Sequence, residues 1–275
     1  MKFAQIKYNN RTHVALVTEK KVIPIDFDGD MIDWILEDHS KPVQHLTEIS
    51  KSDAHYLPPI MRPSKIIAIG LNYKDHAAEC KIEIPNQPLV FSKFPNTLIG
   101  HKQRICWHLA ISRQVDFEAE LAVIIGKQIY RCSKDFAFDA VWGYTCANDV
   151  SARDLQFGDG QWVRGKSLDS FCPLGPWIVQ KDEIPDPHNL EIQCVVNSRI
   201  MQKSNTNQMI FSIPELISFL SHHFTLYPGD IILTGTPDGV GVFRKPPVFL
   251  VDADNVSVEI EKIGCLANRT KVIVQ

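Results

Sequence analysis

The sequence predicts a mainly β fold of the α+β class, with a small N-terminal α+β domain followed by a larger second domain. Short β-like segments recur along the whole chain, helical patterns are few, and strands and helices do not alternate regularly. A proline-rich stretch separates the first segments from the rest. With 275 residues, the chain has room for one large domain or two modest ones.

The N-terminal domain is predicted from three short strands and one helix, which occupy residues 3–8, 13–18, 22–25 and 30–38. Pro58, Pro59 and Pro63 follow in the stretch at 56–65, where they remove backbone donors and disfavour helix. We therefore expect a boundary near residue 63, with the domains at 1–63 and 64–275.

The second domain is predicted to be mainly β, because strand-like segments recur at short spacing. These segments are 65–70, 88–93, 117–126, 141–149, 176–179, 190–197, 199–204, 230–236, 256–264 and 270–275. Asn197 and Ser198 suit a hairpin turn between two of them. One clear helix is expected to begin at Ser212, where Ser212 and Glu215 form a capping-box pattern.

The composition excludes several functional classes. Twenty-nine Lys and Arg against 32 Asp and Glu give a net charge of −3, so no global basic field favours nucleic acid. The longest apolar run, Leu121 to Ile125, is far shorter than the roughly 20 residues of a membrane span.

Seven scattered cysteines without a C-x-x-C pair argue against a disulfide frame and favour a reducing compartment. No secretory signal is evident at the start of the sequence. We expect a cytoplasmic protein, or one of the mitochondrial matrix if a presequence has been removed.

Two carboxylates two residues apart give the first candidate site. Glu118 and Glu120 project from the same face of a predicted strand, and Asp149 ends another apolar segment, so it can join them if the two strands are neighbours. Three hard oxygen ligands suit Mg²⁺, Mn²⁺ or Ca²⁺ better than zinc. A half-exposed strand with a polar face is the alternative.

A His–Glu pair gives the second candidate. Asn72 is expected to cap a short helix with Asp75 in its first turn, and His76 and Glu79 then stand three residues apart on one face. A carboxylate that orients an imidazole makes it a candidate general base. The alternative is an incidental polar pair on a surface helix.

The segment "GQWVRGKS" at 160–167 fits the phosphate-binding loop pattern only superficially. No buried strand precedes it, prolines follow it, and Trp162 is too bulky for a phosphate cradle, so we exclude nucleotide binding. Lys166 stays a candidate for neutralising a substrate anion. The turn in "ILTGTPDGVG" at 232–241 either binds a carboxylate or is a tight loop without a ligand.

The segments "GLNYKDHAAE", "VDFEAELAVIIG", "ANDVSARDLQ", "GKSLDSFCPLGP" and "ILTGTPDGVGVFRKPP" occur in this order between about Lys65 and Lys271. Together they resemble the fumarylacetoacetate hydrolase family, most closely its domain-containing protein 2 type. The resemblance implies a mixed β-roll domain with a smaller N-terminal domain, usually in a homodimer. Residues 100–114 depart from the family's usual Pro-containing turn, so we assign no substrate contacts there.

The resemblance also implies roles for individual residues. It implies a Mg²⁺ or Mn²⁺ site at Glu118, Glu120 and Asp149, and a catalytic dyad at His76 and Glu79. Further residues implied at the active site are Lys166 as its lysine, Gln156 as a polar residue near the substrate, Thr236 as a contact of the substrate carboxylate, and the segment at 72–85 as a lid that closes as a short helix.

The substrates implied by this family are short 2-oxo acids, whose enolate a bound cation stabilises. Oxaloacetate keto–enol tautomerisation is the first expectation. Hydrolysis of an acylpyruvate carbon–carbon bond and oxaloacetate decarboxylation are the alternatives within the same chemistry. Outside enzymes, the alternative is a catalytically silent, metal-stabilised binding module.

Overall fold

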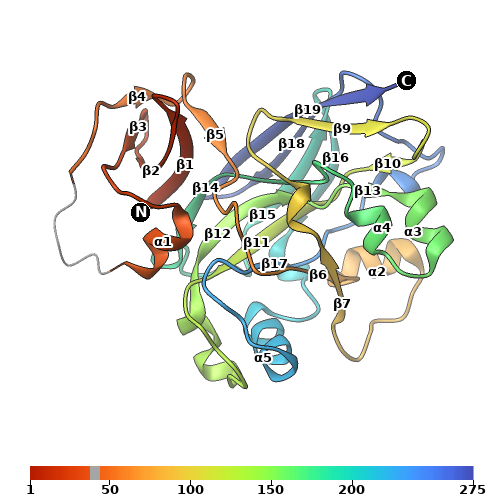
Figure 1. Ribbon diagram of the computed structural model, residues 1–275. Helices are drawn as coiled ribbons and strands as arrows, with labels where there is room; N and C mark the ends of the chain where they lie inside the picture. Colours follow the sequence, from red (N-terminus) through yellow and green to blue (C-terminus); the bar gives the residue numbers. More distant parts are fainter. Residues whose placement is uncertain (38–43, 275) are drawn as a thin grey trace.

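The computed structural model describes residues 1–37 and 44–274 (Figure 1). A 12-stranded sheet, a five-stranded sheet and a two-stranded pair make up most of this described part of the chain. The predicted mainly β class is therefore confirmed. The N-terminal strands lie at one end of the molecule and the helices α2, α3 and α4 lie at the other (Figure 1).

The large sheet contains, in sequence order, β1 (Lys2–Tyr8), β2 (Arg11–Val17), β3 (Lys21–Pro24), β4 (Ile49–Ser50), β5 (His55–Leu57), β6 (Ile66–Gly70), β7 (Leu89–Lys93), β8 (Leu98–Ile99), β11 (Ala119–Ile125), β12 (Val141–Asn148), β14 (Cys172–Gln180) and β17 (Ile231–Leu233). The five-stranded sheet contains β9 (Arg104–His108), β15 (Glu191–Val196), β16 (Arg199–Asn205), β18 (Asn255–Ile260) and β19 (Gly264–Ile273). The pair is β10 (Val115–Asp116) with β13 (Ser151–Ala152).

The α-helices are α1 (Met31–Leu36), α2 (Lys74–Cys80), α3 (Arg153–Asp159), α4 (Val163–Lys166) and α5 (Ile213–His223). Short 3₁₀ helices are η1 (Pro95–Thr97), η2 (Lys134–Ala140), η3 (Lys181–Glu183), η4 (Thr206–Gln208) and η5 (Gly241–Phe243). Among the described helices, none has the length and apolarity needed to cross a bilayer.

The large sheet runs in the order β4-β3-β2-β1-β14-β12-β11-β17-β6-β7. Most neighbours are antiparallel, but β17 pairs with β6 in parallel. Strand β1 pairs with β14, so the N-terminal strands continue the same sheet as the strands of the second half. The domain boundary near residue 63 stays a prediction.

Strand β11 lies in the middle of this sheet and is buried on both faces. Leu121 and Val123 belong to one apolar cluster, Ala122 and Ile124 belong to the cluster on the other face, and all are fully buried. Burial on both faces is what the unbroken apolar run predicted. Any polar side chain at the start of β11 is thereby held inside the protein.

Two predicted local features are confirmed. Asn197 and Ser198 have φ angles of 49° and 66°, which suit a type I′ hairpin turn between β15 and β16. The carboxylate of Glu215 accepts a hydrogen bond from the Ser212 backbone at 2.9 Å, and α5 follows.

Two other predicted elements reach beyond the described part of the chain. The N-terminal helix begins after Asp30, whose side chain accepts hydrogen bonds from the first turn, but Asp38 at its predicted end lies outside the described residues. Gln275, at the end of the last predicted strand, also lies outside them.

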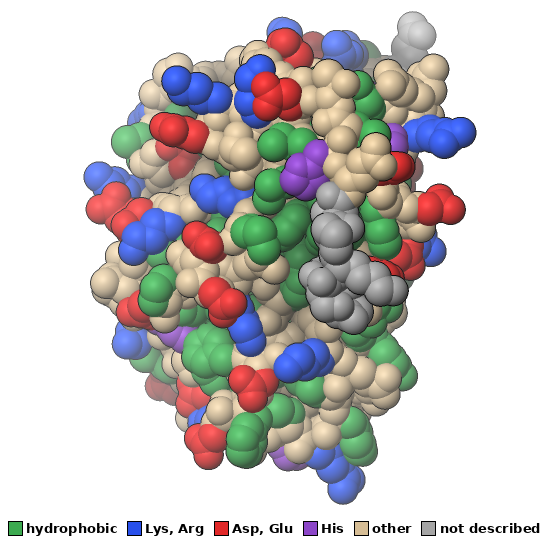
Figure 2. All heavy atoms as spheres, turned by 90° about the vertical axis from the view of Figure 1, so that its left-hand side faces the viewer, with side chains coloured by type: hydrophobic (Ala, Val, Ile, Leu, Met, Phe, Trp, Pro, Cys, Tyr) green, Lys and Arg blue, Asp and Glu red, His purple; other side chains and the backbone are tan. Residues whose placement is uncertain are grey.

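The surface carries charges of both signs. On the face shown in Figure 2, Lys and Arg side chains alternate with Asp and Glu side chains, and neither sign forms one continuous field. This mixture agrees with the small net charge of −3.

Candidate active site

Glu118, Glu120 and Asp149 meet where β11 begins and β12 ends. The two strands pair antiparallel, with Ala119 opposite Asn148, and the Asp149 N–H donates to the Glu118 carbonyl at 2.9 Å. One carboxylate oxygen from each of the three residues lies within 4.8 Å of the others, and all three residues are buried. The structure therefore brings together the three acids that the sequence singled out.

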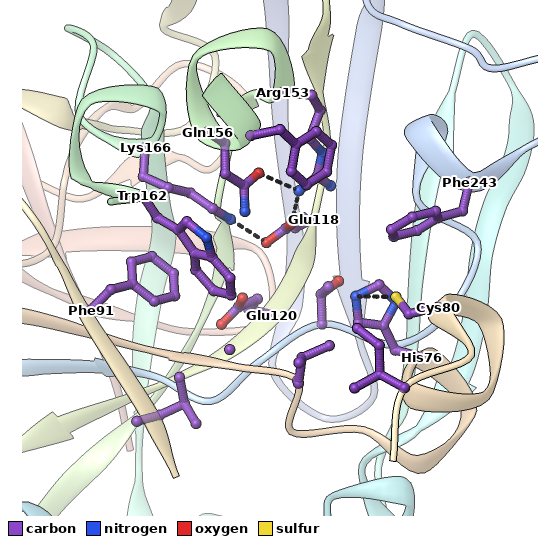
Figure 3. A pocket seen from close by; sticks show the side chains of 16 residues that line it. His76, Cys80, Phe91, Glu118, Glu120, Arg153, Gln156, Trp162, Lys166 and Phe243 are labelled. Carbon is purple, nitrogen blue, oxygen red and sulfur yellow. Dashed lines mark hydrogen bonds and ion pairs between the residues drawn. The ribbon is translucent and has the colours of Figure 1, made fainter. Parts of the chain in front are cut away.

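Lys166 lies directly against two of these acids. Its Nζ atom is 2.7 Å from Glu118 Oε2 and 2.8 Å from Asp149 Oδ2 (Figure 3 shows the Glu118 contact). A second buried ammonium, Lys93 Nζ, is 2.6 Å from Asp149 Oδ1. Sequence reasoning had considered only a substrate anion as the partner of Lys166, and it missed Lys93.

Arg153, at the start of α3, adds a third buried cation. Its Nη1 is 2.7 Å from Glu118 Oε1 and donates to Gln156 Oε1 at 2.9 Å, while its Nε donates to the buried Asp116 at 2.9 Å. Its Nη2 is buried and has no hydrogen-bond partner. Arg153 and Asp116 were also missed by sequence reasoning, although Arg153 stands only four residues after Asp149.

Glu120 differs from the other two acids because no cationic side chain contacts it within the described residues. Its Oε2 accepts a hydrogen bond from the Gly235 N–H at 2.8 Å. Burial, followed by repulsion from Asp149 and Glu118, raises the pKa of Glu120 well above its ordinary value. Burial alone would also raise the pKa of Glu118, but Lys166 and Arg153 outweigh it and lower that pKa to about 2.

The charges in this cluster do not cancel. Four buried carboxylates face three buried cations, so one negative charge remains uncompensated when all of the groups are ionised. The carboxylates are Asp116, Glu118, Glu120 and Asp149, and the cations are Lys93, Arg153 and Lys166. An all-oxygen donor set with surplus negative charge fits a hard divalent cation.

His76 and Glu79 form the expected pair on α2. Nδ1 of His76 lies 2.9 Å from Glu79 Oε2, and Glu79 Oε1 accepts a hydrogen bond from the Gly239 N–H at 2.9 Å. Burial opposes a charge on His76, but contacts with Cys80 and Glu79 outweigh it and raise the pKa of His76 to about 9. The ring is therefore protonated at neutral pH.

The expected capping role of Asn72 is wrong. Tyr73 occupies the position before α2, and the Asn72 amide instead donates to the carbonyls of Thr234 and Phe211. Its oxygen accepts the Phe211 N–H at 2.8 Å. A long-range contact with two backbone segments satisfies the amide, so Asn72 anchors the segment before α2 rather than the helix itself.

Glu118 and Glu120 of the acidic cluster and His76 of the pair line one cavity of about 110 Å³ (Figure 3). Glu118 and Glu120 lie between Trp162 and Phe91 on one side and His76, Cys80 and Phe243 on the other (Figure 3). The volume is well below the usual 300–1,000 Å³ of ligand pockets, which favours a small ligand. The predicted residues that line the cavity are His76, Glu118, Glu120, Gln156, Lys166 and Thr236. Asp149 and Glu79 are not among the residues that line it.

The segment at 160–167 does not form a phosphate loop. Residues Val163–Lys166 form α4, which follows α3 directly, and no strand leads into the segment. A side chain on Gly165 would come within 2.8 Å of the Ala152 carbonyl, so this glycine permits the close packing of α4. The segment at 160–167 places Trp162 and Lys166 at the cavity.

Residues 100–114, where the sequence departs from the family pattern, lie away from the cavity. Their strand β9 pairs in parallel with β19 in the five-stranded sheet. None of these residues is among those that line the cavity.

Comparisons with known proteins agree with this geometry. Residues 65–271 match the family described as fumarylacetoacetate (FAA) hydrolase C-terminal. The chain is 50% identical over 226 residues to a Bos taurus protein named mitochondrial oxaloacetate tautomerase, covering 82% of this chain and 72% of that one. It is 41% identical to the Bacillus subtilis oxaloacetate tautomerase YisK, covering 98% and 99%.

The fold has solved counterparts. A fumarylacetoacetate hydrolase from Exiguobacterium antarcticum superimposes with a TM-score of 0.90 at 33% identity, over 99% of this chain and 100% of that one.

Proposed function

The chain belongs to the fumarylacetoacetate hydrolase family, and we propose that it is a divalent-metal-dependent oxaloacetate keto–enol tautomerase. The names of its relatives support the reaction. One observation on this chain supports the site: the buried carboxylates of Glu118 and Glu120 line the same small cavity as His76.

Glu118, Glu120 and Asp149 would hold the metal, for which Mg²⁺ is the first choice and Mn²⁺ or Ca²⁺ the alternatives. Their oxygen donors support this assignment, and so does the raised pKa of Glu120, because burial and two neighbouring carboxylates oppose its charge unless a cation is bound. When bound, such an ion acts as a Lewis acid that lowers the free energy of an enolate next to a carboxylate.

His76 would move the proton at carbon 3 of the substrate. In the enol-to-keto direction, the electrons of the carbon 2–carbon 3 double bond take a proton from the imidazolium and form the new bond between carbon 3 and hydrogen. The bond between carbon 2 and its oxygen becomes the carbonyl, and the proton of the enol oxygen passes to water. The raised pKa of His76, about 9, supports a proton donor at neutral pH. Glu79 keeps the ring oriented, and the Gly239 N–H holds Glu79.

Cationic and polar groups would hold the substrate's carboxylates. Arg153 has a buried Nη2 without a partner and lines the cavity, which makes it the strongest candidate. Lys166, Gln156 and Thr236 line the same cavity. Lys166 also helps to lower the pKa of Glu118, because its ammonium lies 2.7 Å from that carboxylate.

The test measures the rates of three reactions with one enzyme preparation, first with Mg²⁺ and then with chelator. We expect Mg²⁺-dependent decay of enol-oxaloacetate that exceeds both pyruvate release from acylpyruvates and carbon dioxide release from oxaloacetate. Faster pyruvate release would assign hydrolysis instead, and faster carbon dioxide release would assign decarboxylation. The absence of all three activities would support a binding module.

The proposed assembly is a homodimer. Strand β7 ends the large sheet and carries exposed Leu89 and Val90, with exposed Phe94 just beyond it, which supports an apolar contact between copies. Sedimentation equilibrium measures this directly.

The proposed location is the cytoplasm or the mitochondrial matrix; the Bos taurus relative is named mitochondrial. Fractionation of the source cells would test it.

A further inference from the structure

Thr236 is the only residue with a hydroxyl side chain among those that line the cavity, all of which are described. It follows β17 and is 5% exposed. A hydroxyl offers one hydrogen and two lone pairs, so its neighbours decide whether it donates to a ligand or accepts from one.

Gln202 on β16 is the neighbour that decides whether the Thr236 hydroxyl donates or accepts. Its Nε2 donates to Thr236 Oγ1 at 2.8 Å and to the Pro237 carbonyl at 2.9 Å. Its Oε1 accepts the Ala119 N–H at 2.8 Å, and the side chain is 1% exposed. All of these contacts are buried.

The orientation of this amide is fixed by backbone groups. If the amide were turned over, Nε2 would face the Ala119 N–H and Oε1 would face the Pro237 carbonyl. Both contacts would be repulsive in a buried place, where an unsatisfied polar group is strongly disfavoured. Gln202 therefore presents a donor, and only a donor, to Thr236.

The Thr236 hydrogen must consequently point away from Gln202. Its acceptor is the Ala119 carbonyl at 3.0 Å. Because a hydroxyl turns freely about its bond, the same hydrogen can move from this carbonyl to an oxygen of a ligand in the cavity. Thr236 is thus set up to donate, which suits a carboxylate.

The Gln202–Thr236 pair also holds the strand that carries two of the acids. Ala119 lies between Glu118 and Glu120, and both of its backbone groups facing away from β12 bond to the pair. Pairing of β11 with β17 begins only at Ala122. The two side chains take the place of a neighbouring strand at this end of β11.

We propose that Gln202 is a positioning residue, which holds the Thr236 hydroxyl as a hydrogen-bond donor to an anionic oxygen of the ligand and couples this subsite to the acidic cluster. The inference rests on the proposed function for the identity of the ligand, a 2-oxo acid with a free carboxylate. It assigns Gln202 no contact with the ligand itself.

The test is Gln202→Glu, which keeps the size of the side chain and, in its ionised form, has no donor; KM is therefore followed across the pH range in which the wild type is active. The Thr236 hydroxyl then donates to the new carboxylate and is lost to the ligand. We expect KM for enol-oxaloacetate to rise at least about tenfold, because the charged oxygen of the ligand loses a hydrogen bond, while kcat changes by less than about threefold. Gln128→Glu, the same change at an exposed position, should alter neither.

A purely structural role is excluded by a double-mutant cycle. In a Thr236→Val background no hydroxyl remains to be oriented, so Gln202→Glu should add little to KM. An equal, additive rise in both backgrounds would overturn the proposal, and so would a fall in kcat at constant KM. Thermal unfolding identifies a variant that fails to fold, and Gln202→Asn, which keeps the amide but cannot reach Thr236, then takes its place in the cycle.

Calorimetric binding of oxalate with Mg²⁺ separates this inference from the reaction. If the wild-type protein binds oxalate without tautomerising oxaloacetate, the proposed function fails, and a tenfold loss of oxalate affinity in Gln202→Glu still supports the role of Gln202. An unchanged oxalate affinity in that variant, or no oxalate binding by the wild type, contradicts the role.

Discussion

The acidic cluster and the His76–Glu79 pair lie on the same cavity but are built in opposite ways. The cluster draws its charges from three strands and two helices, and each contact joins residues far apart in the sequence, as Lys166 does with Glu118. The two residues of the pair stand three positions apart on one short helix. Charge balance in the cluster therefore depends on the whole fold, whereas the pair depends on α2 and the turn that holds it.

Breaking the pair should remove the reaction and leave the cluster intact. For His76→Ala we expect kcat to fall by about 10²–10⁴, the usual contribution of a positioned acid or base. Mg²⁺ affinity, measured by calorimetry, should stay at the wild-type value. Exposed His223→Ala is the matched control. A parallel loss of Mg²⁺ binding in His76→Ala would show that the two regions are not separate.

Removing one cation from the cluster should instead lower the free energy of unfolding. Lys93→Met leaves Asp149 with Lys166 alone, and the loss of one partner of a buried pair destabilises by about 3–5 kcal/mol. Mg²⁺ should restore part of this loss because it binds the folded state. Urea unfolding measures both effects, with exposed Lys7→Met as control. A change below about 1 kcal/mol would contradict the charge count.

Removing the carboxylate of Glu120 should weaken Mg²⁺ binding and stabilise the metal-free protein. Glu120→Gln should weaken Mg²⁺ binding by at least about a hundredfold. This loss exceeds the usual effect of mutating a residue that only hydrogen-bonds to a metal ligand. The raised pKa of Glu120 means that the metal-free protein loses stability as pH rises above 4.5, the ordinary value. The metal-free variant should therefore melt higher than metal-free wild type at pH 7, and Mg²⁺ should stabilise only the wild type. A lower melting temperature of the metal-free variant would argue against repulsion at Glu120.

The smallest expected effect is a shift in pH dependence. The pKa of His76 is raised from the ordinary 6.5 to about 9, so the folded protein keeps this proton until the pH reaches about 9. The stability that the proton contributes is fully present below pH 6.5 and is lost as the pH rises through 9. Glu79→Gln should move the upper limb of the kcat/KM profile for enol-oxaloacetate down by about 1–2 pH units. An unmoved limb would mean that Glu79 does not set the protonation of His76.

The comparison also explains what the sequence could predict. Glu118 and Glu120 were found because side chains repeat every two residues on a strand. Asp149 was found because it ends another apolar segment, and the structure pairs that strand, β12, with β11. His76 and Glu79 were found because helical neighbours are local. Gln156 was found only through the family resemblance, whereas Lys166 and the turn that contains Thr236 were candidates from their own segments before the resemblance gave them roles.

The missed residues act through contacts that no local pattern reveals. Lys93 meets Asp149 across 56 positions, and Gln202 meets Ala119 across 83. Asn72 has the right residue type for a helix cap, yet contacts with Phe211 and Thr234 decide its position. Sequence spacing therefore predicts side chains that share one element, and fails where the fold joins distant ones.

The most direct test of the account is the rate of enol-oxaloacetate conversion by the wild-type protein as free Mg²⁺ is raised from a chelated baseline. We expect a rate near the uncatalysed value without the ion and a saturable rise with it, at the same Mg²⁺ concentrations that stabilise the protein against heat. A rate that is fast under chelation and flat with added Mg²⁺ would contradict the acidic cluster as the site of the reaction.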